Sequence, residues 1–158
     1  MEYHLAQVNI AKMIAGLDDP VMTGFVERLD EINSLADQSK GFVWRFQTEQ
    51  GDATYLRPYE DDSILFNMSV WESLEDLRNY VYRSMHLELL KAKTNWFVKM
   101  DDAHLALWWV KIGAIPNVEQ GLEKLRVINV RGPCPEAFTF ARHFPMPDKK
   151  VDDLVSCN

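Results

Sequence analysis

The chain has 158 residues, of which 47% are hydrophobic and 26% are charged, and its formal net charge is −7. These values are typical of a single globular domain and exclude a disordered or membrane-spanning chain. The cations form no basic patch that would bind phosphates, so we expect no nucleic-acid partner, and without an apolar leader at the N-terminus we expect a cytoplasmic location.

The first part of the chain predicts a strand, a helix and a second strand. Residues 4–11 alternate weakly between apolar and polar, which is typical of a strand. Asp19 followed by Pro20 favours a helix start, and Gly41 favours its end. The run FVWRFQTE then predicts a strand over 42–49.

The clearest strand is ILFNMSVW, residues 64–71. Its side chains alternate between two faces, one fully apolar and one mixed. Ser73 is a cap for the next helix, and we expect the helical pattern to continue, with a bend, as far as Trp96 and Phe97. Residues 50–62 are predicted to be a loop.

The remaining elements are shorter or more buried. HLALWWVKI, residues 104–112, predicts a fourth strand that is almost wholly apolar, with Trp108 and Trp109 on opposite faces. Asn117 and Gln120 resemble a capping box that opens a short helix. Residues 137–141 predict a last short strand, and we expect one domain over 1–144 followed by a polar tail over 145–158.

This order of elements predicts an α+β fold: a ferredoxin-like antiparallel sheet with helices on one face. The other face would be apolar and uncovered, and a second copy of the chain would cover it, giving a dimeric α+β barrel. We therefore expect a homodimer. The residues expected on the uncovered face are Phe42, Trp44, Phe46, Ile64, Phe66 and Met68.

Four stretches carry a resemblance to a known family: LAQVNIA (5–11), GFVWRFQ (41–47), NMSVWESLEDLRNYVYRSMH (67–86), and LWWV (107–110) followed by GPCPEAFTF (132–140). Together they resemble an uncharacterised, domain-of-unknown-function family of the dimeric α+β barrel superfamily, which also holds antibiotic biosynthesis monooxygenase-like proteins. The resemblance implies a sheet-to-sheet homodimer with a pocket in each protomer between helices and sheet. Members of the superfamily include cofactor-independent oxygenases, cyclases, isomerases and haem-binding enzymes, and a fold selects none of these activities.

Polar side chains share the mixed face of the first three strands, so we expect them to converge if these strands are neighbours. They have two interpretations: a buried hydrogen-bonded network, or a ligand site. In the ligand site, Arg45 would hold negative charge and Asn67 would orient the ligand. The residues concerned are Gln7, Asn9, Arg45, Gln47, Asn67 and Ser69.

His86 is the expected general base, because an unperturbed imidazole titrates near neutral pH. The resemblance also favours His86, since related proteins have a strand ending in a pair like Trp71-Glu72 before a helix that bears a histidine. Tyr82 lies one turn earlier on the same helix face. The alternative is a histidine that only packs or faces solvent.

The predicted function is binding or conversion of a small apolar molecule, aromatic or polyketide-like. If the protein is an enzyme, we expect a monooxygenase, cyclase or isomerase that needs no cofactor and no metal. The alternatives are a non-catalytic ligand-binding dimer and a haem-binding protein with His86 as ligand. The predicted substrate-binding residues are Asn9, Tyr82, Trp96, Phe97 and Trp109, beside the predicted catalytic residues His86, Arg45 and Asn67.

Overall fold

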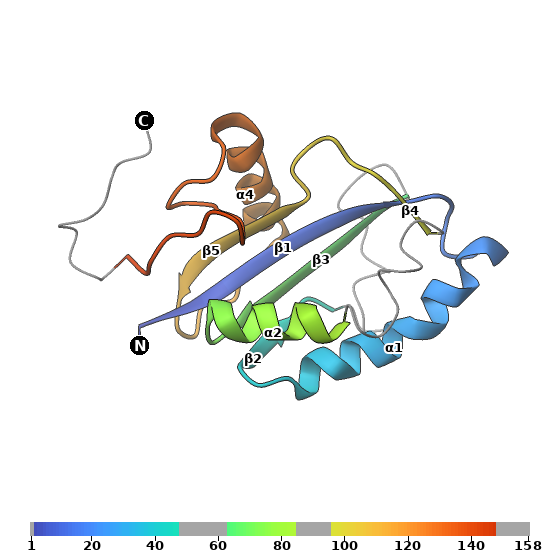
Figure 1. The fold of residues 1–158 in the computed structure, drawn as a ribbon, viewed down its shortest axis with the longest axis horizontal. Coiled ribbons are helices and arrows are strands. Elements are labelled where there is room, and N and C mark those ends of the chain that lie inside the picture. The colour runs from blue at the N-terminus through green and yellow to red at the C-terminus, as the bar shows by residue number, and fades with distance from the viewer. Residues whose placement is uncertain (1, 48–62, 85–95, 148–158) are drawn as a thin grey trace.

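The computed structural model describes residues 2–47, 63–84 and 96–147, and its elements surround one antiparallel sheet (Figure 1). The elements in chain order are β1 (Tyr3–Met13), η1 (Pro20–Met22), α1 (Thr23–Gln38), β2 (Phe42–Arg45), β3 (Ile64–Trp71), α2 (Leu74–Ser84), β4 (Phe97–Val98), β5 (Leu105–Lys111) and α4 (Val118–Arg131).

The sheet has the strand order expected for a ferredoxin-like fold. β3 lies between β2 and β1, and the other edge of β1 pairs with β5 near its start and with β4 at its end. Every pair is antiparallel. The predicted α+β class with an antiparallel sheet is therefore confirmed.

One side of the sheet, which we call the first face, is covered by α1 and α2, as predicted. Ala36 of α1 and Leu77 of α2 are buried against Leu5 and Trp71 of the sheet. At the other end of this face, Phe25 of α1 is buried in a second apolar cluster. The first face therefore carries two apolar clusters, one at each end.

The opposite side, the second face, is covered in part by α4. Phe66 and Met68 are only 1% and 0% exposed, and Leu125 of α4 packs into the same cluster. Gly121 lies so close that a Cβ there would be 3.2 Å from Met68 Sδ. The prediction that Phe66 and Met68 lie on an uncovered face was therefore wrong, because the last helix of the same chain covers them.

Phe42 was also assigned to the wrong face. The pairing of β2 with β3 shifts register between Phe42 and Trp44. Such a bulge reverses the alternation of side chains on one side of it. Phe42 consequently makes an edge-to-face contact with Trp71 on the first face, with ring centroids 5.5 Å apart, while Trp44 packs with the cluster on the second face.

The ends of the helices follow the predicted signals closely. Asp19 caps η1 at the start of the first helical segment, Ser73 Oγ accepts from the Asp76 N–H at the start of α2, and Asn117 with Gln120 forms the predicted capping box of α4. α4 is longer than the short helix we expected. Two other expectations were wrong: Phe97 starts strand β4 instead of ending a helix, and residues 137–141 form only isolated bridges.

Candidate functional site

A row of polar side chains crosses the middle of the first face, between its two apolar clusters. The strand register places Gln7 opposite Ser69, and Asn9 opposite Asn67. The period-two alternation that predicted this convergence is confirmed. We call Asn9, Gln7, Ser69 and Trp71 the polar row.

Hydrogen bonds join the polar row into a continuous chain. Gln7 Nε2 and Trp71 Nε1 both donate to Ser69 Oγ, at 2.7 and 2.8 Å. Asn9 Nδ2 donates to Gln7 Oε1 at 2.9 Å. Gln7 and Ser69 are 4% and 6% exposed, so these bonds satisfy polar groups that burial would otherwise destabilise.

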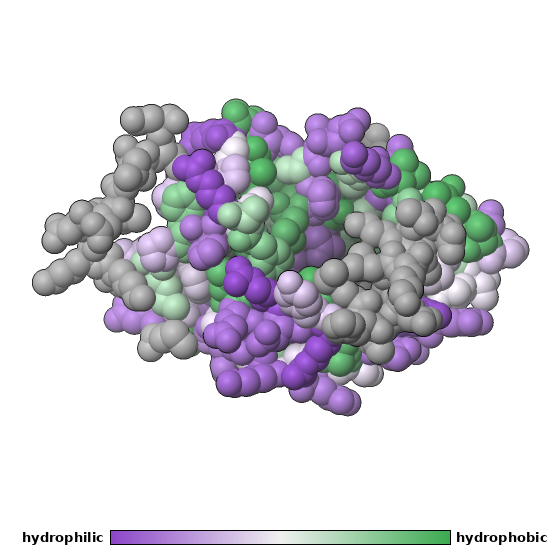
Figure 2. Space-filling model, in the orientation of Figure 1, coloured by the Kyte–Doolittle hydropathy of each residue, from purple (hydrophilic) through white to green (hydrophobic). Residues whose placement is uncertain are grey.

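The polar row emerges toward solvent at its Asn9 end. Asn9 is half-buried and its neighbour Asn67 on β3 is exposed, although both lie on a face that helices cover elsewhere. Figure 2 views the molecule in the same orientation as Figure 1 and shows apolar residues gathered in the middle, between α2 and α4, with mostly polar residues on the lower helices. Two amide side chains therefore stand at the open end of a buried polar row.

The buried end of the row is held by α2. The ring of Tyr80 stacks on Trp71, with centroids 4.9 Å apart and an angle of 24° between planes. Burial raises the pKa of Tyr80 to about 12, an effect that Arg45 opposes and Asp37 adds to. Tyr80 is therefore a neutral phenol at any physiological pH.

Arg45 lies on the first face opposite Ser69, and its guanidinium is paired with a carboxylate of α1. Arg45 Nε lies 2.8 Å from Asp37 Oδ1, and Nη2 lies 3.4 Å from Oδ2. The Arg45 side chain is 15% exposed and that of Asp37 is 45% exposed. An anionic ligand at Arg45 would therefore share this cation with Asp37.

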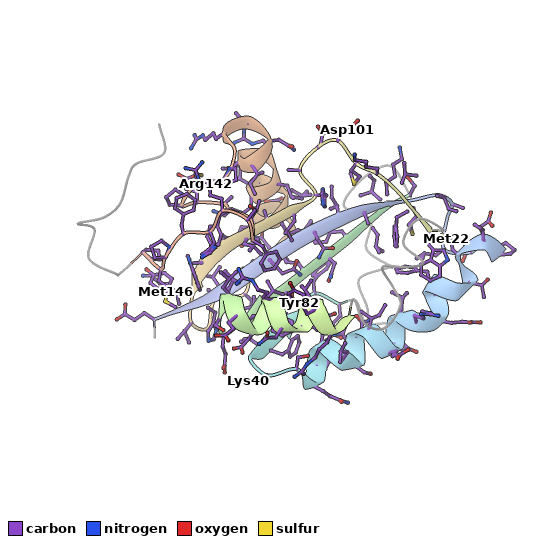
Figure 3. The ribbon with its side chains drawn as sticks, viewed as in Figure 1. Met22, Lys40, Tyr82, Asp101, Arg142 and Met146 are labelled. Atoms are coloured by element: carbon purple, nitrogen blue, oxygen red, sulfur yellow. The ribbon has the colours of Figure 1, made fainter. Side chains whose placement is uncertain are left out.

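The predicted substrate-binding aromatics lie at the two ends of the first face. Trp96 and Phe97 pack with Phe25 in the cluster at one end, whereas Trp109 packs at the other end and its Nε1 donates to Phe144 O at 2.8 Å. Tyr82 is 59% exposed on α2, where Figure 3 labels it. Of the predicted residues, the structure thus brings Asn9 and Asn67 together, with Arg45 farther along the same face.

His86, the predicted general base or haem ligand, lies outside the described residues. The described part of the first face offers amides, a hydroxyl and an indole around the polar row, which are not haem ligands. Across residues 2–47, 63–84 and 96–147, no group of three or more His, Cys, Asp or Glu side chains is placed to hold a metal ion. Within the same ranges no helix combines the length and apolarity needed to cross a membrane.

Two members of this arrangement were not among the predicted site residues. The sequence predicted no site role for Trp71 or Tyr80. The sequence does indicate the position of Trp71, because the alternation of side chains places it on the same side of β3 as Ser69 and Asn67. What the sequence did not indicate is that the indole N–H turns back to Ser69 instead of facing a ligand.

One family model, described as Domain of unknown function (DUF3291), matches residues 4–154. Two solved structures are similar in part. A protein of unknown function from Nitrosomonas europaea is 10% identical, with a TM-score of 0.46, covering 73% of this chain and 95% of that one. SnoaB, a cofactor-independent oxygenase from Streptomyces nogalater, is 14% identical, with a TM-score of 0.45, covering 75% and 98%. No curated protein matches the sequence significantly.

Proposed function

Because the chain belongs to the DUF3291 family, for which the description gives no activity, we propose its function from its own side chains. We propose that the protein binds a small, flat, uncharged molecule on the first face, at the open end of the polar row. The observation that carries this proposal is the position of Asn9 and Asn67, which put one half-buried and one exposed amide side by side on a face that helices cover elsewhere.

The chemistry of the row favours a neutral ligand with an oxygen. Asn9 gives one N–H to Gln7, which leaves its carbonyl and second N–H for a ligand, and the Asn67 amide offers a donor and an acceptor. Within the described ranges, the charged pair beside the row is Arg45 with Asp37, in which each charge offsets the other. A few polar groups in fixed positions are what small-molecule sites use to orient a ligand.

As an enzyme, the protein would be a monooxygenase, cyclase or isomerase that works without a bound cofactor. In the oxygenation case dioxygen is the oxidant and the substrate itself the reductant. Asn67 would then stabilise negative charge that develops on the substrate oxygen, with Arg45 as a more distant cation and His86 as the group that moves a proton. A non-catalytic ligand-binding protein that uses the same face is the second candidate.

Binding can be tested with a matched pair of probes, 2-naphthol and naphthalene, titrated into the full chain and followed by tryptophan fluorescence. We expect 2-naphthol to bind more tightly than naphthalene, because only the hydroxyl can use the amides. Asn67→Ala and Asn9→Ala should weaken 2-naphthol by about tenfold, the value of one hydrogen bond, and leave naphthalene unchanged. Asn79→Ala, at an exposed position of α2, is the control. Equal affinities for the two probes would contradict the proposal.

Catalysis is separated from binding by His86→Ala. For the enzyme we expect unchanged 2-naphthol affinity together with loss of any oxygen uptake or substrate isomerisation in the wild type. For the binding protein we expect no turnover in either variant. Unchanged turnover in His86→Ala would remove this residue from the mechanism.

We also propose that the chain forms a homodimer through the part of the second face beside α4. Trp44, Phe46 and Ile64 pack against the buried cluster there but keep part of their surface exposed. Ile64→Glu should give a folded monomer in native mass spectrometry. Val130→Glu, a substitution at an apolar side chain of α4 that is 70% exposed, should stay dimeric. A monomeric wild type would overturn this assembly.

A further inference from the structure

The sheet has a gap along the outer edge of β1, directly after Asn9. β5 pairs with β1 as far as Asn9, and β4 pairs only with Lys12 and Met13. The segment between β4 and β5 returns to the edge at one point, where the Ile10 N–H donates to His104 O at 2.9 Å. A cavity of about 390 Å³ opens there, which we call the edge cavity. The described residues that line it are Ile10, Ala11, Phe97, Val98, Lys99, Met100 and His104.

The described residues that line the edge cavity are apolar except for two with ionisable side chains. Phe97, Val98 and Met100 are apolar residues of the segment between β4 and β5, and Lys99 and His104 are the ionisable ones. Both are exposed, and neither takes part in an ion pair in the described structure. The edge cavity therefore combines apolar walls with one permanent cation and one imidazole at an accessible mouth.

The acidic residues of the same segment face a different space. Asp101 and Asp102 line a second, more open cavity of about 520 Å³ that also contacts Asn129 at the end of α4. Met100 and His104 border both cavities. Figure 3 labels Asp101 on this segment, far in the view from Tyr82 on α2. Of the two cavities, Lys99 thus borders the edge cavity, Asp101 and Asp102 border the second, and His104 borders both.

We propose that the edge cavity binds a monocarboxylate with an apolar tail. Phe97, Val98 and Met100 hold the tail, while Lys99 and His104 receive the carboxylate at the mouth. The volume lies within the range of roughly 300 to 1,000 Å³ that is typical of small-molecule sites, and an apolar lining with few polar groups is their usual composition. A carboxylate pairs with a lysine ammonium through charge-assisted hydrogen bonds. This site shares no lining residue with the polar row, and it does not depend on the proposed function.

The test uses the full chain with methyl-labelled methionine and decanoate as the probe. Decanoate should bind saturably and shift the methyl resonance of Met100, which borders the cavity, and not that of Met68, which is 0% exposed under α4. Decanol, which has the tail without the charge, should bind about tenfold more weakly. Acetate, which has the charge without the tail, should show no saturable binding, because burial of the tail supplies most of the affinity.

Lys99→Gln should weaken decanoate binding by about tenfold and leave decanol unchanged, and His104→Gln should act in the same direction. Lys111→Gln removes the same charge at the exposed end of β5 and is the control. Asn67→Ala should have no effect, which separates this site from the polar row. The proposal is overturned if decanol and decanoate bind equally, if Met68 shifts in place of Met100, or if Lys111→Gln weakens binding as much as Lys99→Gln.

Discussion

Tyr80 of α2 lies flat on Trp71 of β3, with ring centroids 4.9 Å apart, and Trp71 in turn donates to Ser69. The stacked pair joins a helix to the polar row through one indole ring. Movement of α2 would therefore disturb the indole, the Ser69 acceptor and the Gln7 amide together, because all three share hydrogen bonds. The rigidity of the proposed binding face depends on this contact.

Tyr80 makes the stability of the protein depend on pH in the alkaline range. Burial raises its pKa from 10.0 to about 12, with smaller opposing effects of Arg45 and Asp37. The folded state therefore holds the phenolic proton after the unfolded state has lost it. The contribution of Tyr80 to the free energy of unfolding is complete below about pH 10. It declines between about pH 10 and 12, by roughly 1.4 kcal/mol per pH unit.

Urea unfolding at about pH 9 and pH 11 measures this effect. Wild type should lose about 1 kcal/mol more than Tyr80→Phe between the two conditions, because phenylalanine has no proton to release. Tyr82→Phe, at a side chain 59% exposed, should behave like wild type. If wild type and Tyr80→Phe decline equally, the phenol is not buried in the way described.

Ser69→Ala removes the acceptor that two buried donors share. Gln7 Nε2 and Trp71 Nε1 would both lose their partner, and a buried unsatisfied donor costs about 1 to 3 kcal/mol. We expect the free energy of unfolding to fall by about 2 to 4 kcal/mol. Ser34→Ala on the exposed side of α1 should change it by less than about 0.5 kcal/mol. A loss at Ser69 no larger than the loss at Ser34 would mean that the shared bonds do not form.

The pair of Arg45 and Asp37 ties β2 to α1 and can be measured by a double-mutant cycle with alanine. Arg45 contacts Asp37 through both Nε and Nη2, and the arginine side chain is only 15% exposed. We therefore expect a coupling free energy of about 1 kcal/mol, the upper end of the range for ion pairs near a surface. Added salt should reduce it. The same cycle on Arg126 and Glu123, both more than half exposed, should give a smaller value. A larger coupling in that exposed pair would contradict the assigned geometry.

The sequence predicted the polar row to the extent that alternation could. Asn9, Asn67 and Ser69 share a face because side chains repeat every two residues, and this holds wherever strands pair without a bulge. At Phe42 a bulge breaks the rule, and no residue type in FVWR signals it. The alternation of side chains also does not indicate which groups donate and which accept hydrogen bonds. The role of Ser69 as the acceptor for both Gln7 and Trp71 therefore could not be predicted.

The coverage of the second face was beyond sequence reasoning for a different reason. Asn117 and Gln120 indicate where α4 begins, and both form the predicted capping box. A capping box does not indicate which surface its helix packs on, and α4 packs over Phe66 and Met68. The strand that begins at Phe97 could not be predicted either. The two-residue strand β4 depends on pairing with Lys12 and Met13, which are distant in the sequence.

The turn between α1 and β2 sets β2 beside β3. Gly41 has a φ of +82°, its carbonyl accepts from the Glu72 N–H at 2.7 Å, and a Cβ there would collide with the Asp76 carboxylate of α2. Gly113 has a similar φ of +89°, but a Cβ at that position would meet no atom within 4 Å. Gly113→Ala should therefore cost about 1 kcal/mol from backbone strain alone.

Gly41→Ala carries the same strain and must also move Asp76, so we expect it to cost about 2 to 3 kcal/mol in urea unfolding. The difference between the two variants isolates the close approach of the turn to α2. Equal costs would mean that α2 does not press on this turn. The larger cost at Gly41 would mean that the turn and the first turn of α2 hold each other in place, which fixes the position of Tyr80 over the polar row.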